Sequence, residues 1–225
     1  MYSEVARALG MFCASMYLAS VVSGIKMFWF YYHAHHLHPV ADLVLDHLPY
    51  LGRVAWVDTA MLVFNVYVLA VFLVRAHARP AMARVLRALA WVHLLRALAV
   101  SVTHVPDVNW VLPSKISVAY IFTPFNLDQV HKYGDMMFSG HTASTVILFL
   151  AYFDCARRKG GELGRGRWIG RIETAVLAIW ASACIVLVLV CRYHYTNDVV
   201  IGAYMGVFVW YWHRDSFPPF PLIDK

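Results

Sequence analysis

The sequence predicts an all-α membrane protein in which six transmembrane helices enclose a lipid-accessible cavity. Hydrophobic side chains make up 61% of the 225 residues and charged side chains only 14%, whereas a soluble domain has about 25% charged residues. Several stretches approach the ~20 apolar residues that an α-helix needs to cross a bilayer. These predicted spans are 11–32, 54–74, 85–103, 135–153, 172–191 and 195–212.

The first of these stretches differs from a cleavable signal peptide. Only Lys26 interrupts residues 11–32, and a histidine-rich segment follows in place of small residues. We therefore expect a retained first span. Because the sequence has no internal repeat, and because Pro218 and Pro219 prevent a further helix, residues 1–225 are expected to form a single membrane domain.

The distribution of basic residues predicts the orientation of the spans. Arginine and lysine concentrate in 75–87 and 154–171, so both connections, and with them both chain ends, are expected on the cytosolic side. Residues 108–125 are also apolar, but Pro113 and Lys115 favour a loop or interfacial segment outside. The net charge of +6 is spread over short patches between apolar runs, which indicates contact with anionic lipid headgroups and excludes nucleic acid as a partner.

Two polar motifs begin the fourth and sixth predicted spans. Residues 134–142 read GDMMFSGHT and contain His141, and residues 192–198 read RYHYTND and contain His194. Both spans start on the same side, so the two histidines are expected at one level of the membrane, on the non-cytosolic face. Polar groups at membrane depth are costly and usually mark function.

The residue types in these motifs indicate phosphoryl-transfer chemistry. His194 and Asp198 are four residues apart, which places them one turn apart on one helical face. The carboxylate can hold one imidazole nitrogen as N–H, leave the other as a nucleophile and stabilise the developing positive charge. His141 supplies a second titrating group that can protonate a leaving alkoxide. His141, His194 and Asp198 are therefore the predicted catalytic residues.

Further residues near the motifs are candidates for substrate binding. Ser139 and Gly140 open a helix whose free N–H groups and dipole suit a phosphate. Arg96 either clamps the phosphate or pairs with Asp58 or another acid, and Asp135 either takes part in the chemistry or caps a neighbour. The candidate substrate-binding residues are Ser139, Gly140, Asp135, Arg96, Arg192 and Tyr195.

No cofactor and no metal are expected. The spacing of His33, His35, His36 and His38 can hold zinc only loosely, and neither a cysteine nor a patterned acid supports it. We interpret this cluster as interfacial and headgroup-facing. The four cysteines show no paired spacing, and three of them lie in or beside apolar segments, where they fit small packing residues.

The two motifs together resemble the sphingomyelin synthase branch of the lipid phosphatase/phosphotransferase superfamily. SGHT at 139–142 and HYTxDV at 194–199 carry the resemblance, and Gly134-Asp135, Arg96 with Thr103 and Pro106, and residues 39–49 fit the same branch. The resemblance implies that His194 attacks phosphorus with help from Asp198, and that His141 acts on the leaving and entering hydroxyls.

Departures from the broader superfamily favour this branch over plain phosphatases. Phe138 replaces the proline that precedes SGH, Arg192 lies only two residues before His194, and no lysine–arginine–proline motif is found. Tyr133 stands where sphingomyelin synthases usually carry cysteine, which leaves the subtype open.

The resemblance implies transfer of phosphocholine or a related headgroup from a glycerophospholipid, expected to be phosphatidylcholine, to ceramide. Diacylglycerol is released, and the group passes through a phosphohistidine. Diacylglycerol as acceptor, hydrolysis by water, and a non-catalytic lipid-binding protein are the alternatives. The expected location is the membrane, with the site facing the Golgi or endoplasmic reticulum lumen or the cell exterior in a eukaryote.

Overall fold

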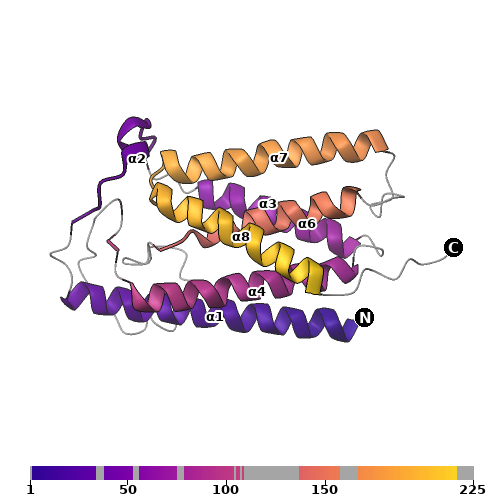
Figure 1. The fold of residues 1–225 in the computed structure, drawn as a ribbon, viewed down its shortest axis with the longest axis horizontal. Coiled ribbons are helices and arrows are strands. Elements are labelled where there is room, and N and C mark those ends of the chain that lie inside the picture. The colour runs from indigo at the N-terminus through magenta and orange to yellow at the C-terminus, as the bar shows by residue number, and fades with distance from the viewer. Residues whose placement is uncertain are drawn as a thin grey trace.

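The described part of the chain is built from long α-helices. A computed structural model describes residues 2–33, 38–52, 56–74, 79–103, 105–106, 108, 137–157 and 167–216. In chain order the helices are α1 (Tyr2–His33), α2 (Leu43–His47), α3 (Trp56–Val74), α4 (Arg79–Val102), α6 (Gly140–Arg157), α7 (Arg167–Val190) and α8 (Thr196–Ser216). All but α2 run along the length of a bundle (Figure 1).

In the described part of the chain the predicted all-helical fold is confirmed, with a long helix in each of the six predicted ranges. Several boundaries differ from the prediction. α1 begins at Tyr2, α4 begins at Arg79, and α6 begins at Gly140 because Ser139 caps its first turn. Of the segment 108–125, only Val108 is among the described residues, so the interpretation of that segment lies outside them.

Four of the long helices are long and apolar enough to cross a membrane. The candidate spans are Ser3–His33, Val57–Val74, Ala81–Val102 and Trp168–Val190, which lie in α1, α3, α4 and α7. These apolar helices fit a membrane protein. α6 and α8 are not among the candidates, so crossing by all six helices stays a prediction.

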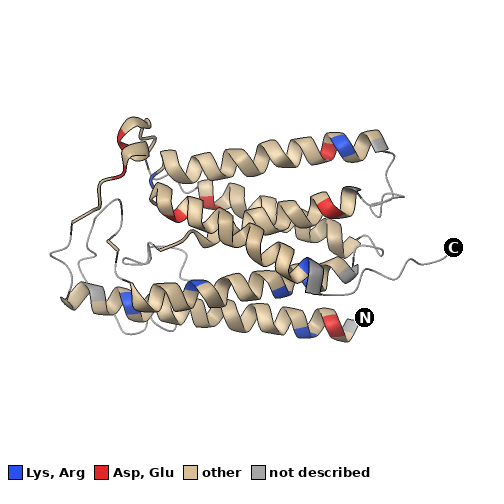
Figure 2. Ribbon diagram, in the orientation of Figure 1, with Lys and Arg blue, Asp and Glu red and all other residues tan. Residues whose placement is uncertain are grey.

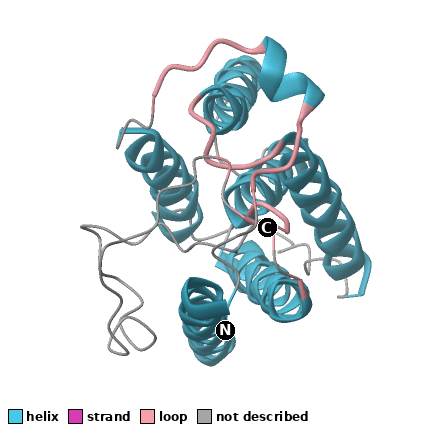
Figure 3. Cartoon of the chain, turned by 90° about the vertical axis from the view of Figure 1, so that its left-hand side faces the viewer, coloured by secondary structure: helices cyan, strands magenta, loops and turns pink. Residues whose placement is uncertain are grey.

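The position of α6 in the bundle explains why it can carry several polar side chains. α6 contacts α3, α4, α7 and α8. The view along the helices shows them arranged around the centre of the bundle (Figure 3). Its polar residues Thr142, Ser144 and Thr145 are buried against these helices. Because protein surrounds it, α6 does not need the apolar outer face that lipid demands of a peripheral helix.

The peripheral helices present apolar side chains outward. Ile179 on α7 is 72% exposed, and Leu62 on α3 and Phe208 on α8 are also exposed. A large exposed apolar surface on a monomer marks contact with another apolar phase. Most charged residues of the described helices lie toward the helix ends, and few lie in the middle of the bundle (Figure 2). Both features fit a bundle that sits in a bilayer.

Ion pairs join helix ends at the end of the bundle opposite α2. Arg87, near the start of α4, pairs with Glu4 at the start of α1. Arg214, near the end of α8, lies 3.6 Å from Asp154 near the end of α6. The starts of α6 and α8 are therefore together at the other end, beside α2 (Figure 1).

Candidate active site

His194 and Asp198 form a buried pair at the start of α8. The imidazole Nδ1 of His194 lies 3.4 Å from Asp198 Oδ2, and the side chains are 7% and 4% exposed. The same carboxylate oxygen accepts a hydrogen bond of 3.2 Å from the backbone N–H of Tyr195. This contact fixes the carboxylate next to the imidazole. With Nδ1 directed at the carboxylate, Nε2 is the nitrogen left for other chemistry.

His141 lies beside this pair. It is the second residue of α6, and the centroid of its ring is 6.3 Å from that of His194. Its Nε2 lies 3.9 Å from Oδ1 of Asp58, and the two side chains are about half exposed. The structure therefore brings His141 together with the His194–Asp198 pair, which lies far from it in sequence. It also adds Asp58, which the sequence suggested only as a partner for Arg96.

The close approach of α8 to α6 depends on two glycines. A Cβ on Gly202 would lie 2.6 Å from the carbonyl oxygen of Ser139, and a Cβ on Gly206 would lie 2.8 Å from that of Ala143. The Ser139 N–H donates to the Asp198 carbonyl at 2.9 Å. Small residues four apart let helix backbones approach in this way. The four-residue spacing of Gly202 and Gly206 is visible in the sequence and is a signal for this close approach of two helices.

The first turn of α6 lies at the site. The Ser139 hydroxyl accepts a hydrogen bond of 3.2 Å from the Thr142 N–H, which makes Ser139 the N-cap. Arg96 of α4 packs against this turn, with its Nε 3.4 Å from the Phe138 carbonyl oxygen. A Cβ on Gly140 would lie 3.1 Å from Arg96 Cδ. Gly140 therefore gives the guanidinium access to the helix N-terminus.

Arg192 follows the end of α7 and contacts the α2 segment, which is α2 with its flanking residues, 38–52. Its φ is +53°, and the hydrogen bonds Arg192 N–H to Leu189 C=O and Tyr193 N–H to Val188 C=O form a Schellman motif. Its Nη2 lies 3.2 Å from the Leu45 carbonyl oxygen, and the guanidinium lies 5.2 Å from the centre of the Tyr50 ring. A role for Arg192 in substrate binding stays a prediction.

Tyr195 also contacts the α2 segment. Its side chain is buried against Leu45, and its hydroxyl accepts a 3.0 Å hydrogen bond from the Val40 N–H. Binding of substrate by Tyr195 stays a prediction. Asp135 and two of the clustered histidines, His35 and His36, lie outside the described residues.

Asp42 connects the α2 segment to the start of α8. Its carboxylate caps α2 through the N–H groups of Val44 and Leu45, each at 3.1 Å. It also accepts 2.6 Å and 2.9 Å hydrogen bonds from the N–H and hydroxyl of Thr196. Burial raises the pKa of this carboxyl, but the hydrogen bonds outweigh burial and hold the pKa below its ordinary value of 3.8. The sequence contained no local sign of this connection.

The fold and the site place this chain in the class of α-helical proteins that carry a histidine–aspartate site at one end of a helix bundle. Residues 133–215 match the model of a family described as PAP2 superfamily C-terminal. None of the curated proteins matches the chain. The family match supports the lipid phosphatase/phosphotransferase superfamily, and with it an enzyme that acts on phospholipid-type substrates. It does not select the sphingomyelin synthase branch.

Proposed function

We propose that the protein transfers the phospho-headgroup of a glycerophospholipid to a lipid alcohol through a phosphohistidine on His194. The main observation behind this proposal is that His141 and the His194–Asp198 pair lie together at the starts of α6 and α8. Phosphoryl transfer depends mainly on positioning and on charge stabilisation. The N-terminus of α6 and the guanidinium of Arg96 supply positive charge for the phosphate oxygens.

The first half-reaction releases diacylglycerol. Nε2 of His194 attacks phosphorus, an N–P bond forms, and the P–O bond to the glycerol oxygen breaks. His141 gives its proton to that oxygen, so neutral diacylglycerol leaves. Asp198 stabilises the positive charge on His194 by accepting from its Nδ1–H.

The second half-reaction consumes a lipid hydroxyl. The primary hydroxyl of ceramide attacks phosphorus, the O–P bond forms, the N–P bond breaks, and His141 takes the hydroxyl proton. With phosphatidylcholine as donor the products are sphingomyelin and diacylglycerol, and both histidines return to their starting states. Ceramide as acceptor and choline as headgroup rest on the resemblance of the two motifs. The histidines, the aspartate and the helix N-terminus supply the chemistry, so the proposal needs no metal.

Transfer must exclude water, because water discharges a phosphohistidine when it reaches the phosphorus. Two apolar side chains beside the site are buried: Phe138 next to Ser139, and Val199 next to Asp198. Burial of the His194–Asp198 pair supports a poorly hydrated nucleophile. These features favour transfer over hydrolysis, and they are the reason to place a lipid alcohol as the acceptor.

The experiment uses the purified full chain in mixed micelles with phosphatidylcholine labelled in both its headgroup and its acyl chains. With the donor alone we expect slow release of diacylglycerol. Added ceramide should accelerate that release and yield an equal amount of phosphosphingolipid. Unchanged release with free phosphocholine as the only headgroup product would make the protein a hydrolase. Acceleration by diacylglycerol but not by ceramide would establish exchange between glycerolipids.

We propose that the site faces away from the cytosol. The end of the bundle opposite the site holds the start of α4 and both ends of the 154–171 connection, and the arginines concentrate in these parts of the chain. Positive residues favour the cytosolic side of a membrane. A lumenal or extracellular site, as proposed here, draws its donor and acceptor from the non-cytosolic leaflet.

A further inference from the structure

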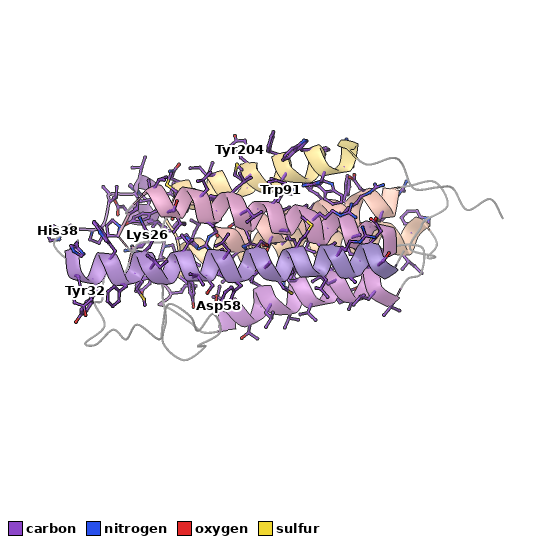
Figure 4. All side chains as sticks on the ribbon, turned by 90° about the horizontal axis from the view of Figure 1, so that it is seen from below. Lys26, Tyr32, His38, Asp58, Trp91 and Tyr204 are labelled. Atoms are coloured by element: carbon purple, nitrogen blue, oxygen red, sulfur yellow. The ribbon has the colours of Figure 1, made fainter. Side chains whose placement is uncertain are left out.

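The carboxylate of Asp58 lies beside the site, and the proposed mechanism does not use it. It is the only acidic or basic side chain of α3, a helix of 19 residues that is otherwise apolar apart from Thr59, Asn65 and Tyr67. It lies in the first turn of α3, in the half of the bundle that also holds Lys26 (Figure 4). An ionisable side chain on a membrane helix is costly, and one that is present usually has a partner and a function.

The side chain of His141 is within reach of this carboxylate. Asp58 Oδ1 is 3.9 Å from His141 Nε2. In the described part of the chain, other titratable or charged groups that act on His141 are His194 from the turn before α8, and Arg96 and His93 from α4. Each of these can carry positive charge and disfavours a proton on His141. The carboxylates at the site carry the opposite charge: Asp58 lies 3.9 Å from His141, and Asp198 contacts the neighbouring His194.

A general acid must hold its proton until the leaving group needs it. In the proposed first half-reaction His141 has to be an imidazolium while His194 is a neutral nucleophile. Two like groups a few ångströms apart need different surroundings to be in different protonation states. Asp198 contacts His194 through Nδ1, whereas Asp58 contacts His141 through Nε2. The second contact leaves Nδ1 of His141 as the nitrogen for the substrate oxygen.

We infer that Asp58 is a positioning residue for the general acid: its carboxylate holds the ring of His141 and favours its protonated form. The site then contains two histidine–carboxylate pairs, one for the nucleophile and one for the acid. This inference rests on the proposed function, because it assigns Asp58 a role only if His141 is the acid.

The test follows kcat/KM for phosphatidylcholine against pH in the full chain, since that constant covers the steps up to diacylglycerol release. In Asp58→Asn the alkaline limb, where the acid loses its proton, should move to lower pH by about one unit, because an opposite charge within ~4–6 Å favours the charged form by that order. Activity at alkaline pH should fall about tenfold, and activity on the acidic side of the limb should be retained. Asp58→Glu should restore the limb in part.

The matched control is Asp46→Asn, which removes an exposed carboxylate from α2 at the same end of the bundle. It should leave the limb where it is. A nitrophenyl ester of phosphocholine needs little acid help, so Asp58→Asn should lose less activity on it than on phosphatidylcholine.

An equal loss at every pH in Asp58→Asn would reduce Asp58 to a structural residue, and an unchanged profile would remove it from the site. His141→Ala separates this inference from the proposed function. If His141→Ala keeps its activity on phosphatidylcholine, the proposed mechanism fails. If His141→Ala is inactive while Asp58→Asn keeps the wild-type profile, only the inference about Asp58 fails.

Discussion

At the scale of single residues, the site is asymmetric between its two histidines. The His194 side chain is 7% exposed and directs Nδ1 at a buried carboxylate, whereas the His141 side chain is 49% exposed and faces a half-exposed one. A buried, fixed imidazole suits a nucleophile that must meet phosphorus along one line. An accessible imidazole suits an acid and base that must serve two different hydroxyl groups.

Replacing either histidine should stop turnover of phosphatidylcholine, but the two variants should respond differently to the leaving group. His194→Ala should lose roughly 10³-fold or more with every donor, because no neighbour can replace the nucleophile. His141→Ala should regain part of its activity with a nitrophenyl ester, which leaves without a proton. Initial rates with both donors give the comparison. His47→Ala, an exposed histidine on α2, is the control. Equal rescue of both variants would contradict the assignment of acid and nucleophile.

Asp198→Asn tests the support of the nucleophile. The amide keeps the shape of the side chain but loses the charge that faces His194 Nδ1 and the Tyr195 N–H. By analogy with other histidine–aspartate pairs, kcat should fall by about 10²- to 10⁴-fold while the protein stays folded. Glu173→Gln, at the far end of α7, is a matched neutralisation away from the site. A wild-type rate in Asp198→Asn would leave Asp198 as a helix-end charge.

At the scale of the elements, the site depends on how α6, α8 and α2 meet. Gly202 and Gly206 let the α8 backbone approach the first turn of α6, and the Asp42 carboxylate links the starts of α2 and α8. Neither feature touches the imidazoles. The glycines set the distance between the helix that carries His141 and the helix that carries Asp198. Asp42 holds the start of that second helix against α2.

Gly202→Ala should push α8 away from α6. The added Cβ would lie 2.6 Å from a backbone oxygen, which cannot move aside as a flexible side chain can. Overpacking of this kind destabilises by about 1–3 kcal/mol. We expect a lower Tm in detergent and a loss of activity. Gly170→Ala on α7 meets nothing within 4 Å and serves as the control. A Tm and rate equal to those of the control would rule out the close approach as a constraint.

Asp42→Ala should destabilise the protein in a pH-dependent way, since each lost helix cap costs about 0.5–2 kcal/mol. The pKa of the Asp42 carboxyl is below its ordinary value of 3.8 in the folded protein. The charged carboxylate therefore adds its full stability above that ordinary value, and this is lost as the pH falls through the folded pKa. The difference in Tm between wild type and Asp42→Ala should be large at pH 7 and shrink in acid. Asp46→Ala should show neither effect.

At the scale of the whole molecule, the bundle has two unlike ends. One holds the starts of α6 and α8 with both histidines, and the other holds ion pairs such as Arg87–Glu4 and Arg214–Asp154. The end with the ion pairs is also the one to which the basic connections return. This polarity along the bundle is what predicts its orientation in a membrane.

Labelling with an impermeant thiol reagent tests that orientation. Two positions of matched exposure report on the two ends: Leu43 is 77% exposed and Trp168 is 75% exposed. Exposed Cys13 is first replaced by serine. In intact cells Leu43→Cys should react and Trp168→Cys should be protected until the membrane is opened. The opposite pattern would reverse the topology, and labelling of both would place the two ends on one side.

The sequence alone determined what depends on local spacing. Apolar runs predicted the six long helices, and the interval between His194 and Asp198 predicted their contact. The reason differs from the predicted one, because His194 lies in the turn before α8 and not on its face. The Asp198 side chain reaches back to this turn, where it also accepts from the Tyr195 N–H. Two motifs at the starts of helices that run in the same direction also predicted that His141 would meet His194.

The tertiary structure decided what depends on the rotation and packing of whole helices. Arg192 and Tyr195 are next to His194 in sequence, yet their side chains contact the α2 segment, because the turn after α7 directs them there. Asp58 meets His141 only because α3 packs against α6 with its first turn at the same level. Such contacts join residues far apart in the chain, and their distances are set by side-chain packing between helices, which no local pattern of residues encodes.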